Sequence, residues 1–198
     1  MPNHARTRIV ITGPLDQRTA VKNLLKGEDN PFDLNRVIPM PATLDVESGT
    51  TTDEAMALAA HVDKLEPWQR PLGFGSVTLE SYRQKNARYD NFEDDDTLAT
   101  AMMRQQPGLL ELGRQVMLNI KAYGAPTWYE WRYAHWGTKW NTYDHEEVRE
   151  TSRSLTYVFC TAWGEPRPVF EQLKKMFPGL KFSIHVDGEV DRPYSYVL

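Results

Sequence analysis

The sequence has no means of forming an internal disulfide, because Cys160 is the only cysteine among its 198 residues. A lone thiol inside an apolar stretch is more often a small buried hydrophobe than a reactive group. Long apolar runs are also missing: nowhere do about 18 apolar residues follow one another, and no signal-peptide core follows the basic N-terminus. We therefore expect a cytoplasmic protein that has no membrane among its partners.

Motifs of catalysis and cofactor binding are absent as well. The chain has neither a glycine-rich phosphate loop nor a Gly-x-Ser-x-Gly nucleophile turn. On this basis no cofactor or metal is expected, no catalytic residue is assigned, and an enzyme is disfavoured.

Neither sign of charge dominates, since 23 basic and 27 acidic residues give a net charge of -4. This balance argues against a broad surface for binding polyanions. The acidity is concentrated between residues 45 and 96, where twelve acidic residues accompany only five basic ones. That segment is therefore expected to differ in role from the rest of the chain.

Both ends of the chain carry the patterns of strands and helices. Leu155–Trp163 alternates as a strand does, and a helical stripe over Val169–Phe177 separates it from a second alternating run, Leu180–Val186. These elements predict an α+β fold: a ferredoxin-like antiparallel sheet with helices on one face, formed by residues 1–44 and 126–198. The other elements of this sheet are a strand at Arg8–Thr12, a helix from Asp16 to Gly27 and a strand candidate at Tyr194–Leu198.

Residues 45–125 are predicted to form a mainly helical, acidic insertion. The spacing of Thr51 and Glu54 predicts a capping box at the start of its first helix. The acidic residues 94–96 precede a second helix, where negative charge favours the helix start. A third helix is predicted over Leu109–Tyr123, closed by a glycine.

Four of the six tryptophans lie between residues 128 and 140. Thr127 and Glu130 have capping-box spacing, which predicts a short helix that Gly137 ends. Aromatic residues interleaved with cations are typical of base-stacking and peptide-anchoring surfaces, whereas buried indoles would form the core between this helix and the sheet. Both interpretations stay open. The candidate binding residues are Trp128, Trp131, Arg132, Trp136, Lys139, Trp140 and Asn141.

Several of these stretches resemble a known family. The clearest are Asn-Arg-Val-Ile-Pro-Met-Pro at 35–41 and Trp-Gly-Thr-Lys-Trp-Asn at 136–141, with supporting matches at 128–131, 159–163 and 176–178. They resemble the YubB-like family, which has a ferredoxin-like domain and occurs on bacterial plasmids and phages. The resemblance implies an accessory protein of a mobile genetic element in a bacterial or host-cell cytoplasm. It implies no reaction and no catalytic residues.

Three functions are weighed. The leading hypothesis is a non-catalytic binding protein that engages a host or mobile-element protein, with interference in host defence as one role. The second is a small metal-dependent hydrolase or nuclease centred on Asp94–Asp96 or on Asp144–Glu147 with His135, although helix-start charge and an ordinary surface loop explain these residues more simply. The third is a single-stranded nucleic-acid binding module. It is disfavoured by the net charge of -4. RNA recognition on the sheet is disfavoured too, because the polar side of the strand Leu180–Val186 offers no aromatic residue for stacking. The sequence does not indicate an oligomeric state.

Overall fold

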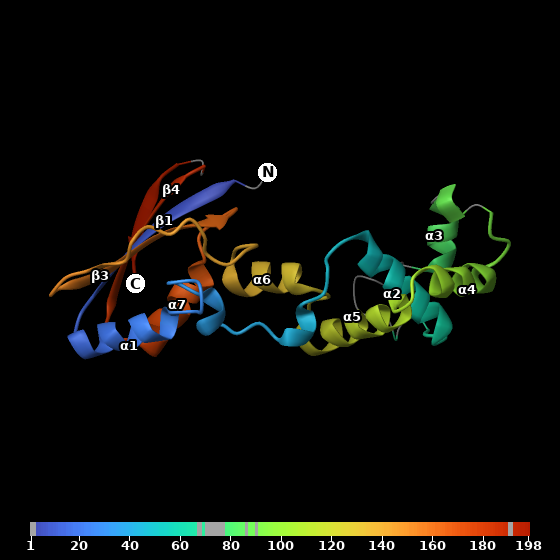
Figure 1. Ribbon diagram of the computed structural model, residues 1–198, viewed down its shortest axis with the longest axis horizontal. Coiled ribbons are helices and arrows are strands. Elements are labelled where there is room, and N and C mark those ends of the chain that lie inside the picture. Colours follow the sequence, from blue (N-terminus) through green and yellow to red (C-terminus); the bar gives the residue numbers. More distant parts are fainter. Residues whose placement is uncertain (1–2, 67–68, 70–77, 86, 90, 190–191) are drawn as a thin grey trace. The chain divides into compact units, whose positions relative to one another are not determined.

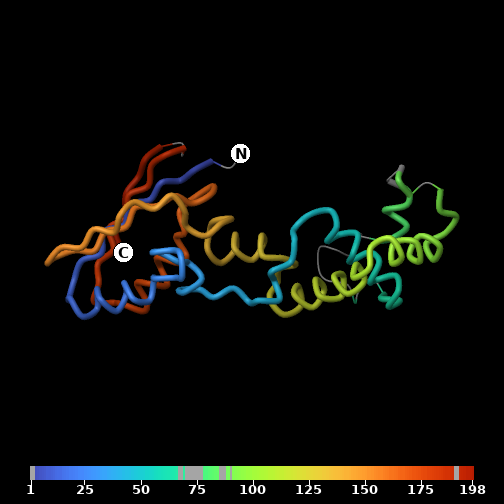
Figure 2. The backbone as a smooth tube through the Cα atoms, viewed as in Figure 1, coloured from blue at the N-terminus to red at the C-terminus, as the bar shows by residue number. Residues whose placement is uncertain are grey.

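The computed structural model describes residues 3–66, 69, 78–85, 87–89, 91–189 and 192–198. The chain divides into two compact units. The first unit combines Met1–Met40 with Arg132–Leu198, and the second is Pro41–Trp131. Figure 2 shows the composition of the first unit by colour, because the blue N-terminal backbone runs among the orange and red C-terminal segments.

The two units differ in charge. In the first unit, 15 basic and 13 acidic residues give a net charge of +2. In the second, 8 basic and 14 acidic residues give a net charge of -6. The acidity of the chain therefore belongs to the second unit.

An antiparallel sheet of five strands organises the first unit, in the order β2-β3-β1-β4-β5 (Figure 1). The central strand is β1, in which Ile9 lies opposite Tyr157 of β3 and Ile184 of β4. Because β3 and β4 both run antiparallel to β1, the path β3-α7-β4 is a split βαβ unit, and the predicted α+β class and antiparallel sheet are confirmed. The elements are β1 (His4–Thr12), α1 (Leu15–Leu25), β2 (Arg149–Glu150), β3 (Ser154–Ala162), α7 (Arg167–Met176), β4 (Lys181–Gly188) and β5 (Tyr194–Val197).

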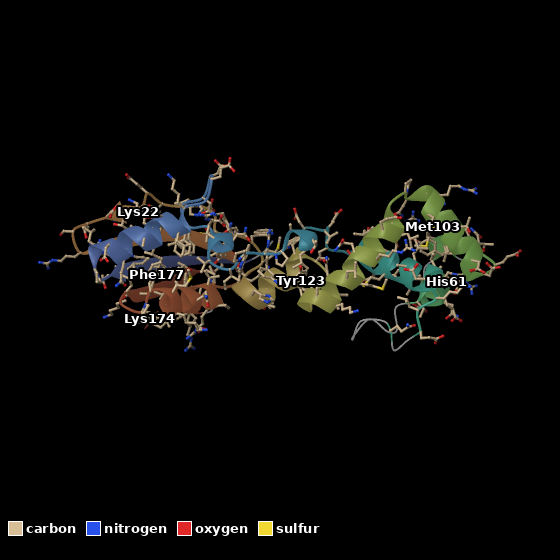
Figure 3. All side chains as sticks on the ribbon, turned by 90° about the horizontal axis from the view of Figure 1, so that it is seen from below. Lys22, His61, Met103, Tyr123, Lys174 and Phe177 are labelled. Atoms are coloured by element: carbon tan, nitrogen blue, oxygen red, sulfur yellow. The ribbon has the colours of Figure 1, made fainter. Side chains whose placement is uncertain are left out.

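Alternation along the strands gives the sheet one covered face and one open face. In β1 every second residue from Ala5 to Ile11 is at most 1% exposed, whereas Arg6 and Arg8 between them are exposed. Both α1 and α7 lie on the side of the buried set, as Figure 1 shows. Figure 3 views the unit from that helical side, with Lys22 on α1 and Lys174 on α7.

Phe32 fills the centre of the covered face. It is fully buried, and its ring centroid lies 4.7 Å from that of Phe159, 5.1 Å from that of Tyr157 and 6.1 Å from that of Phe170. Fully burying one such side chain contributes about 2 kcal/mol. The loop after α1 is thereby anchored between the sheet and α7.

The second unit is helical. Its α2 and α5 approach closely at Gly113, where an added Cβ atom would lie 2.0 Å from the carbonyl oxygen of Ala55. Only glycine permits that distance between the helices. The predicted helix over Leu109–Tyr123 is present with those bounds and ends at Gly124, whose φ of 71° is left-handed. The helices are α2 (Thr50–Val62), α3 (Leu79–Lys85), α4 (Asp95–Gln105) and α5 (Leu109–Tyr123), and α6 (Trp128–Trp136) contains the boundary between the units.

Helix caps in the second unit differ from one another. The capping box predicted for Thr51 and Glu54 is wrong, because α2 begins at Thr50 and its N-cap, Gly49, makes no side-chain capping bond. At α4 the capping box is real: Asp94 accepts a hydrogen bond from the backbone N–H of Thr97, and the Thr97 hydroxyl reaches back to the backbone of Asp94. The same spacing of three residues therefore forms a capping box at Asp94 and not at Thr51.

Candidate functional site: the open face of the sheet

The tryptophans of the predicted binding set divide between core and surface. Trp136 is 1% exposed and Trp131 is 5% exposed, so neither offers its ring to a partner. Trp128 is half-buried and stacks edge-on against Tyr129, with the ring centroids 5.8 Å apart. Trp140 is the most exposed of the four, at 37%.

Trp136 and Asn141 hold the loop after α1 in place. The indole N–H of Trp136 donates to the carbonyl of Ile38 at 2.9 Å, and the amide oxygen of Asn141 accepts from the backbone N–H of Leu34 at 2.9 Å. The Arg132 guanidinium lies over the Trp136 ring, 5.0 Å from its centroid. The two stretches at 35–41 and 136–141 therefore contact each other. Trp136, Asn141 and Arg132 of the predicted binding set therefore have structural roles.

A buried polar network continues from this contact. The hydroxyl of Thr142 donates to the carbonyl of Phe32 at 2.5 Å and is hydrogen-bonded to Nε2 of His145 at 2.8 Å. Burial lowers the pKa of His145 below its ordinary value, and the charge of neighbouring Asp144 opposes this only in part. His145 is therefore neutral at physiological pH.

The state of His145 makes stability depend on pH. As pH falls, the unfolded chain takes up the proton at an ordinary pKa of about 6.5 while the folded chain does not. Stability is then complete above about pH 7 and declines as pH falls through 6.5 toward the lower folded pKa. We expect the urea concentration at the unfolding midpoint to decrease as the pH is lowered from about 7 to 5.5. His145→Gln should remove this dependence of the midpoint on pH. Exposed His185→Gln is the control. An unchanged slope in His145→Gln contradicts this assignment.

The acidic residues Asp94–Asp96, predicted as one centre for a metal-dependent hydrolase, have structural partners. Asp94 caps α4, Asp95 pairs with Arg83 at 2.9 Å, and Asp96 contacts the His61 ring at 2.8 Å. Among the described residues, no group of three or more His, Cys, Asp or Glu side chains is arranged to hold a metal ion.

The open face of the sheet gathers side chains from four strands. A row across its middle contains Val158 of β3, Arg8 of β1, His185 of β4 and Ser195 of β5, which are paired in register. The adjoining row contains Val10, Ser183 and Val197. In Figure 1, α1 and α7 both lie on the other side of the sheet. We call these seven residues the open-face site.

A groove of about 300 Å³ runs through this site. Its walls come from β1 and β5, and its floor comes from β4. Arg8 makes no hydrogen bond or ion pair with any described residue, so its guanidinium is available to an anionic group. Lys181, further along β4, is also exposed and has no such partner in the described part of the chain. The groove is lined by Arg8, Val10, Ser183, Ile184, His185, Ser195, Tyr196 and Val197.

The neighbouring cation on β1 is neutralised. Arg6 hydrogen-bonds to Glu146 and lies 3.5 Å from Asp187, and the bond to Glu146 raises the pKa of Arg6. Cys160 lies opposite Arg6 in β3, where burial raises the pKa of the half-buried thiol and keeps it protonated. Arg8 is consequently the cation of β1 that remains free for a ligand.

Aromatic residues border one end of the open face. Tyr143 pairs with Cys160 as an extension of the sheet, and its hydroxyl is hydrogen-bonded to Nδ1 of His4 at 2.6 Å. The ring of Trp140 contacts Tyr143 edge-on at 6.1 Å, and the Lys139 ammonium lies 5.1 Å from the Trp140 centroid. Two predicted residues, Lys139 and Trp140, thus lie beside the open face.

The far wall of the groove is fixed from the helical side. Tyr194 and Tyr196 of β5 both donate hydrogen bonds to Glu165, and the Arg167 guanidinium lies 4.6 Å from the Tyr196 centroid. These contacts hold the short strand β5 against the N-terminal end of α7. The groove therefore has ordered walls on both sides.

Sequence reasoning did not identify Arg8, His185 or Ser195 as one site. The signal was present in β1, where Arg6 and Arg8 alternate with buried residues and mark the polar side of a central strand. What joins that side to β4 and β5 is strand pairing between distant parts of the chain, which periodicity alone does not supply.

No known family profile and no curated protein matches this sequence. Among solved structures, the chain is similar to the crystal structure of protein api92 from Yersinia pseudotuberculosis, of the family DUF1281. The two are 12% identical, the alignment covers 100% of this chain and 94% of that one, and the TM-score is 0.45. None of the helices that the structure describes is both long and apolar enough to cross a membrane.

Proposed function

We propose that this protein is a non-catalytic binding protein of a phage or plasmid, and that it engages an acidic segment of a host or mobile-element protein through the open face of its sheet. Interference with host defence is one role that such binding would serve. The observation that carries the proposal is Arg8, an unpaired guanidinium at the centre of an uncovered, grooved sheet face.

The composition of the face fits a protein partner. Binding energy in protein interfaces is concentrated in Trp, Tyr and Arg side chains. Arg8 provides the bidentate donor that carboxylates prefer, and Val10 and Val197 supply apolar area next to it. Trp140 adds an exposed aromatic ring at the bordering end.

An acidic protein segment fits better than a nucleic acid. Glu146 and Asp187 lie next to Arg6 on the same face, and a continuous phosphate backbone would pass these carboxylates as well as Arg8. Single-strand binding also uses successive stacking platforms along the strand. Among the described residues, the rings of Trp140 and Tyr143 stand at one end of this face and do not follow the groove. An acidic segment that reaches Arg8 and Lys181 therefore meets less repulsion.

The mobile-element part of the proposal rests on the resemblance of 35–41 and 136–141 to the YubB-like family. The contacts of Trp136 and Asn141 with the loop after α1 give those stretches a shared structural role in this chain.

Peptide binding tests the proposal. A fluorescent extended peptide that alternates glutamate with valine is expected to bind with a Kd of about 100 µM or tighter, measured by anisotropy. The same peptide with lysine in place of glutamate is expected not to bind. Arg8→Glu should weaken the acidic peptide about tenfold or more, because it removes the donor and adds repulsion.

Lys181→Glu and Lys175→Glu form a matched pair of controls. Both lysines are exposed, but Lys181 lies on the open side of β4 and Lys175 on α7, which covers the opposite face. We expect weaker binding only in Lys181→Glu. Equal affinity in wild type and Arg8→Glu would refute the proposal. So would tighter binding of a thymidine oligonucleotide than of the acidic peptide, since that result assigns the face to single-stranded nucleic acid.

A further inference from the structure

A second cavity lies on the covered side of the first unit, away from the open face. Its volume is about 400 Å³, which is within the range of small-molecule sites. One wall is the C-terminal end of α1 with the loop that follows it, and the other is formed by Val148 and Tyr157. The cavity is lined by Lys22, Lys26, Gly27, Glu28, Asp29, Asn30, Pro31, Val148 and Tyr157.

Tyr157 brings its hydroxyl to this cavity. The side chain is 2% exposed, and its ring packs edge-on against Phe32. Its hydroxyl makes no hydrogen bond within the described part of the chain. The hydroxyl oxygen is not one of the enclosed side-chain atoms that lack a partner, so it can be reached from the cavity. A group in the cavity that accepts or donates a hydrogen bond can therefore bind it.

The charges at the rim limit what such a ligand can be. The ammonium of Lys22 is already paired with Glu150 at 2.6 Å, whereas Lys26 has no ion pair among the described residues. The single charge of Lys26 therefore matches a ligand with one negative charge. The exposed carboxylates of Glu28 and Asp29 stand at the same rim and would repel a ligand of higher negative charge.

The rest of the wall is apolar. Pro31, Val148 and the ring of Tyr157 offer surface to a hydrocarbon or aromatic body. Pockets for small molecules combine such surface with a few polar groups that fix orientation. Here those polar groups are the Tyr157 hydroxyl inside and the Lys26 ammonium at the mouth.

We propose that this cavity binds a small organic monocarboxylate, with its apolar body against Val148 and Tyr157 and its carboxylate at Lys26. In ligands that carry a second polar atom, that atom bonds the Tyr157 hydroxyl. The site is independent of the open face, and each of the two proposals stands without the other.

Amide chemical shifts of the isotopically labelled full chain, titrated with benzoate, test this site. Saturable shifts are expected at Gly27, Asn30 and Val148, with a Kd of about 1 mM or tighter. Lys26→Gln should weaken benzoate about fivefold. Tyr157→Phe should leave it unchanged, because benzoate has no polar atom besides the carboxylate that lies at Lys26. Lys175→Gln, a matched change on α7, should have no effect.

Two related probes and one stability measurement complete the test. Benzyl alcohol, which keeps the ring without the charge, and phenyl phosphate, which carries more negative charge, should both bind more weakly than benzoate. Tyr157→Phe should unfold at a temperature no lower than wild type, because no described residue forms a hydrogen bond with the Tyr157 hydroxyl. Absence of saturable shifts, equal or tighter binding of either related probe, or a clearly lower unfolding temperature in Tyr157→Phe would each overturn the proposal.

Discussion

Replacing Trp136 with alanine is expected to lower the free energy of unfolding of the first unit by about 4 kcal/mol. The indole is 1% exposed, donates a hydrogen bond to the carbonyl of Ile38 and lies under the guanidinium of Arg132. Truncation would leave a large cavity, a carbonyl without its donor and a cation without its aromatic face. Equilibrium urea denaturation, followed by circular dichroism, measures the loss.

Trp140→Ala is the matched control, since this indole is 37% exposed and forms no core contact of that kind. We expect it to cost less than about 1 kcal/mol. If the two alanine variants lose the same small amount, the assignment of Trp136 to the core is wrong. Trp136 would then belong to the exposed surface together with Trp140.

Replacing Arg18 with methionine is expected to cost about 3 kcal/mol. Arg18 is only 1% exposed, and its guanidinium donates to the carbonyls of Gly13, Thr151 and Ser152 at 2.8–3.2 Å. These bonds join the start of α1 to the turn between β2 and β3. Methionine keeps much of the apolar stem but leaves three buried acceptors without their donor.

Lys22→Met, one turn further along α1, separates this effect from a general loss of charge. Lys22 forms an exposed ion pair with Glu150, and such pairs contribute about 0.5 kcal/mol or less. The free energies of unfolding of the two variants, measured by thermal and urea unfolding, should therefore differ by at least about 2 kcal/mol. Equal losses would show that the buried hydrogen bonds of Arg18 contribute no more than a surface pair.

Strong periodicity made much of the fold predictable. The alternation from Leu155 onward, the apolar stripe of α7 and the alternation of β4 each indicate an element that the structure contains. Local rules also placed α5 and its terminal glycine. These elements are readable because a half-buried strand or helix repeats its burial pattern over many residues.

Short elements were not readable in the same way. The strand β2 has two residues, Arg149 and Glu150, so it is too short for any alternation to appear. The N-cap of α2 depended on the local backbone at Gly49 rather than on the spacing of Thr51 and Glu54. For β2, pairing with β3 decided what the local sequence could not.

The candidate site was only partly readable for a related reason. A tryptophan in a sequence indicates a large contact area but does not say which residues it contacts. The sequence therefore could not tell that Trp136 is buried and Trp140 is exposed. Arg8, at the centre of the open face, is an ordinary residue in an ordinary strand. Its importance follows from register with β4 and β5, which lie more than 170 positions away in the chain.

Mapping the acidic peptide on the labelled full chain by amide chemical shifts tests the central claim most directly. The account predicts saturable shifts at Arg8, Ser183, His185 and Ser195, which share the open face, and their disappearance in Arg8→Glu. Shifts confined to α1, to α7 or to the second unit, or shifts that persist unchanged in Arg8→Glu, would contradict it.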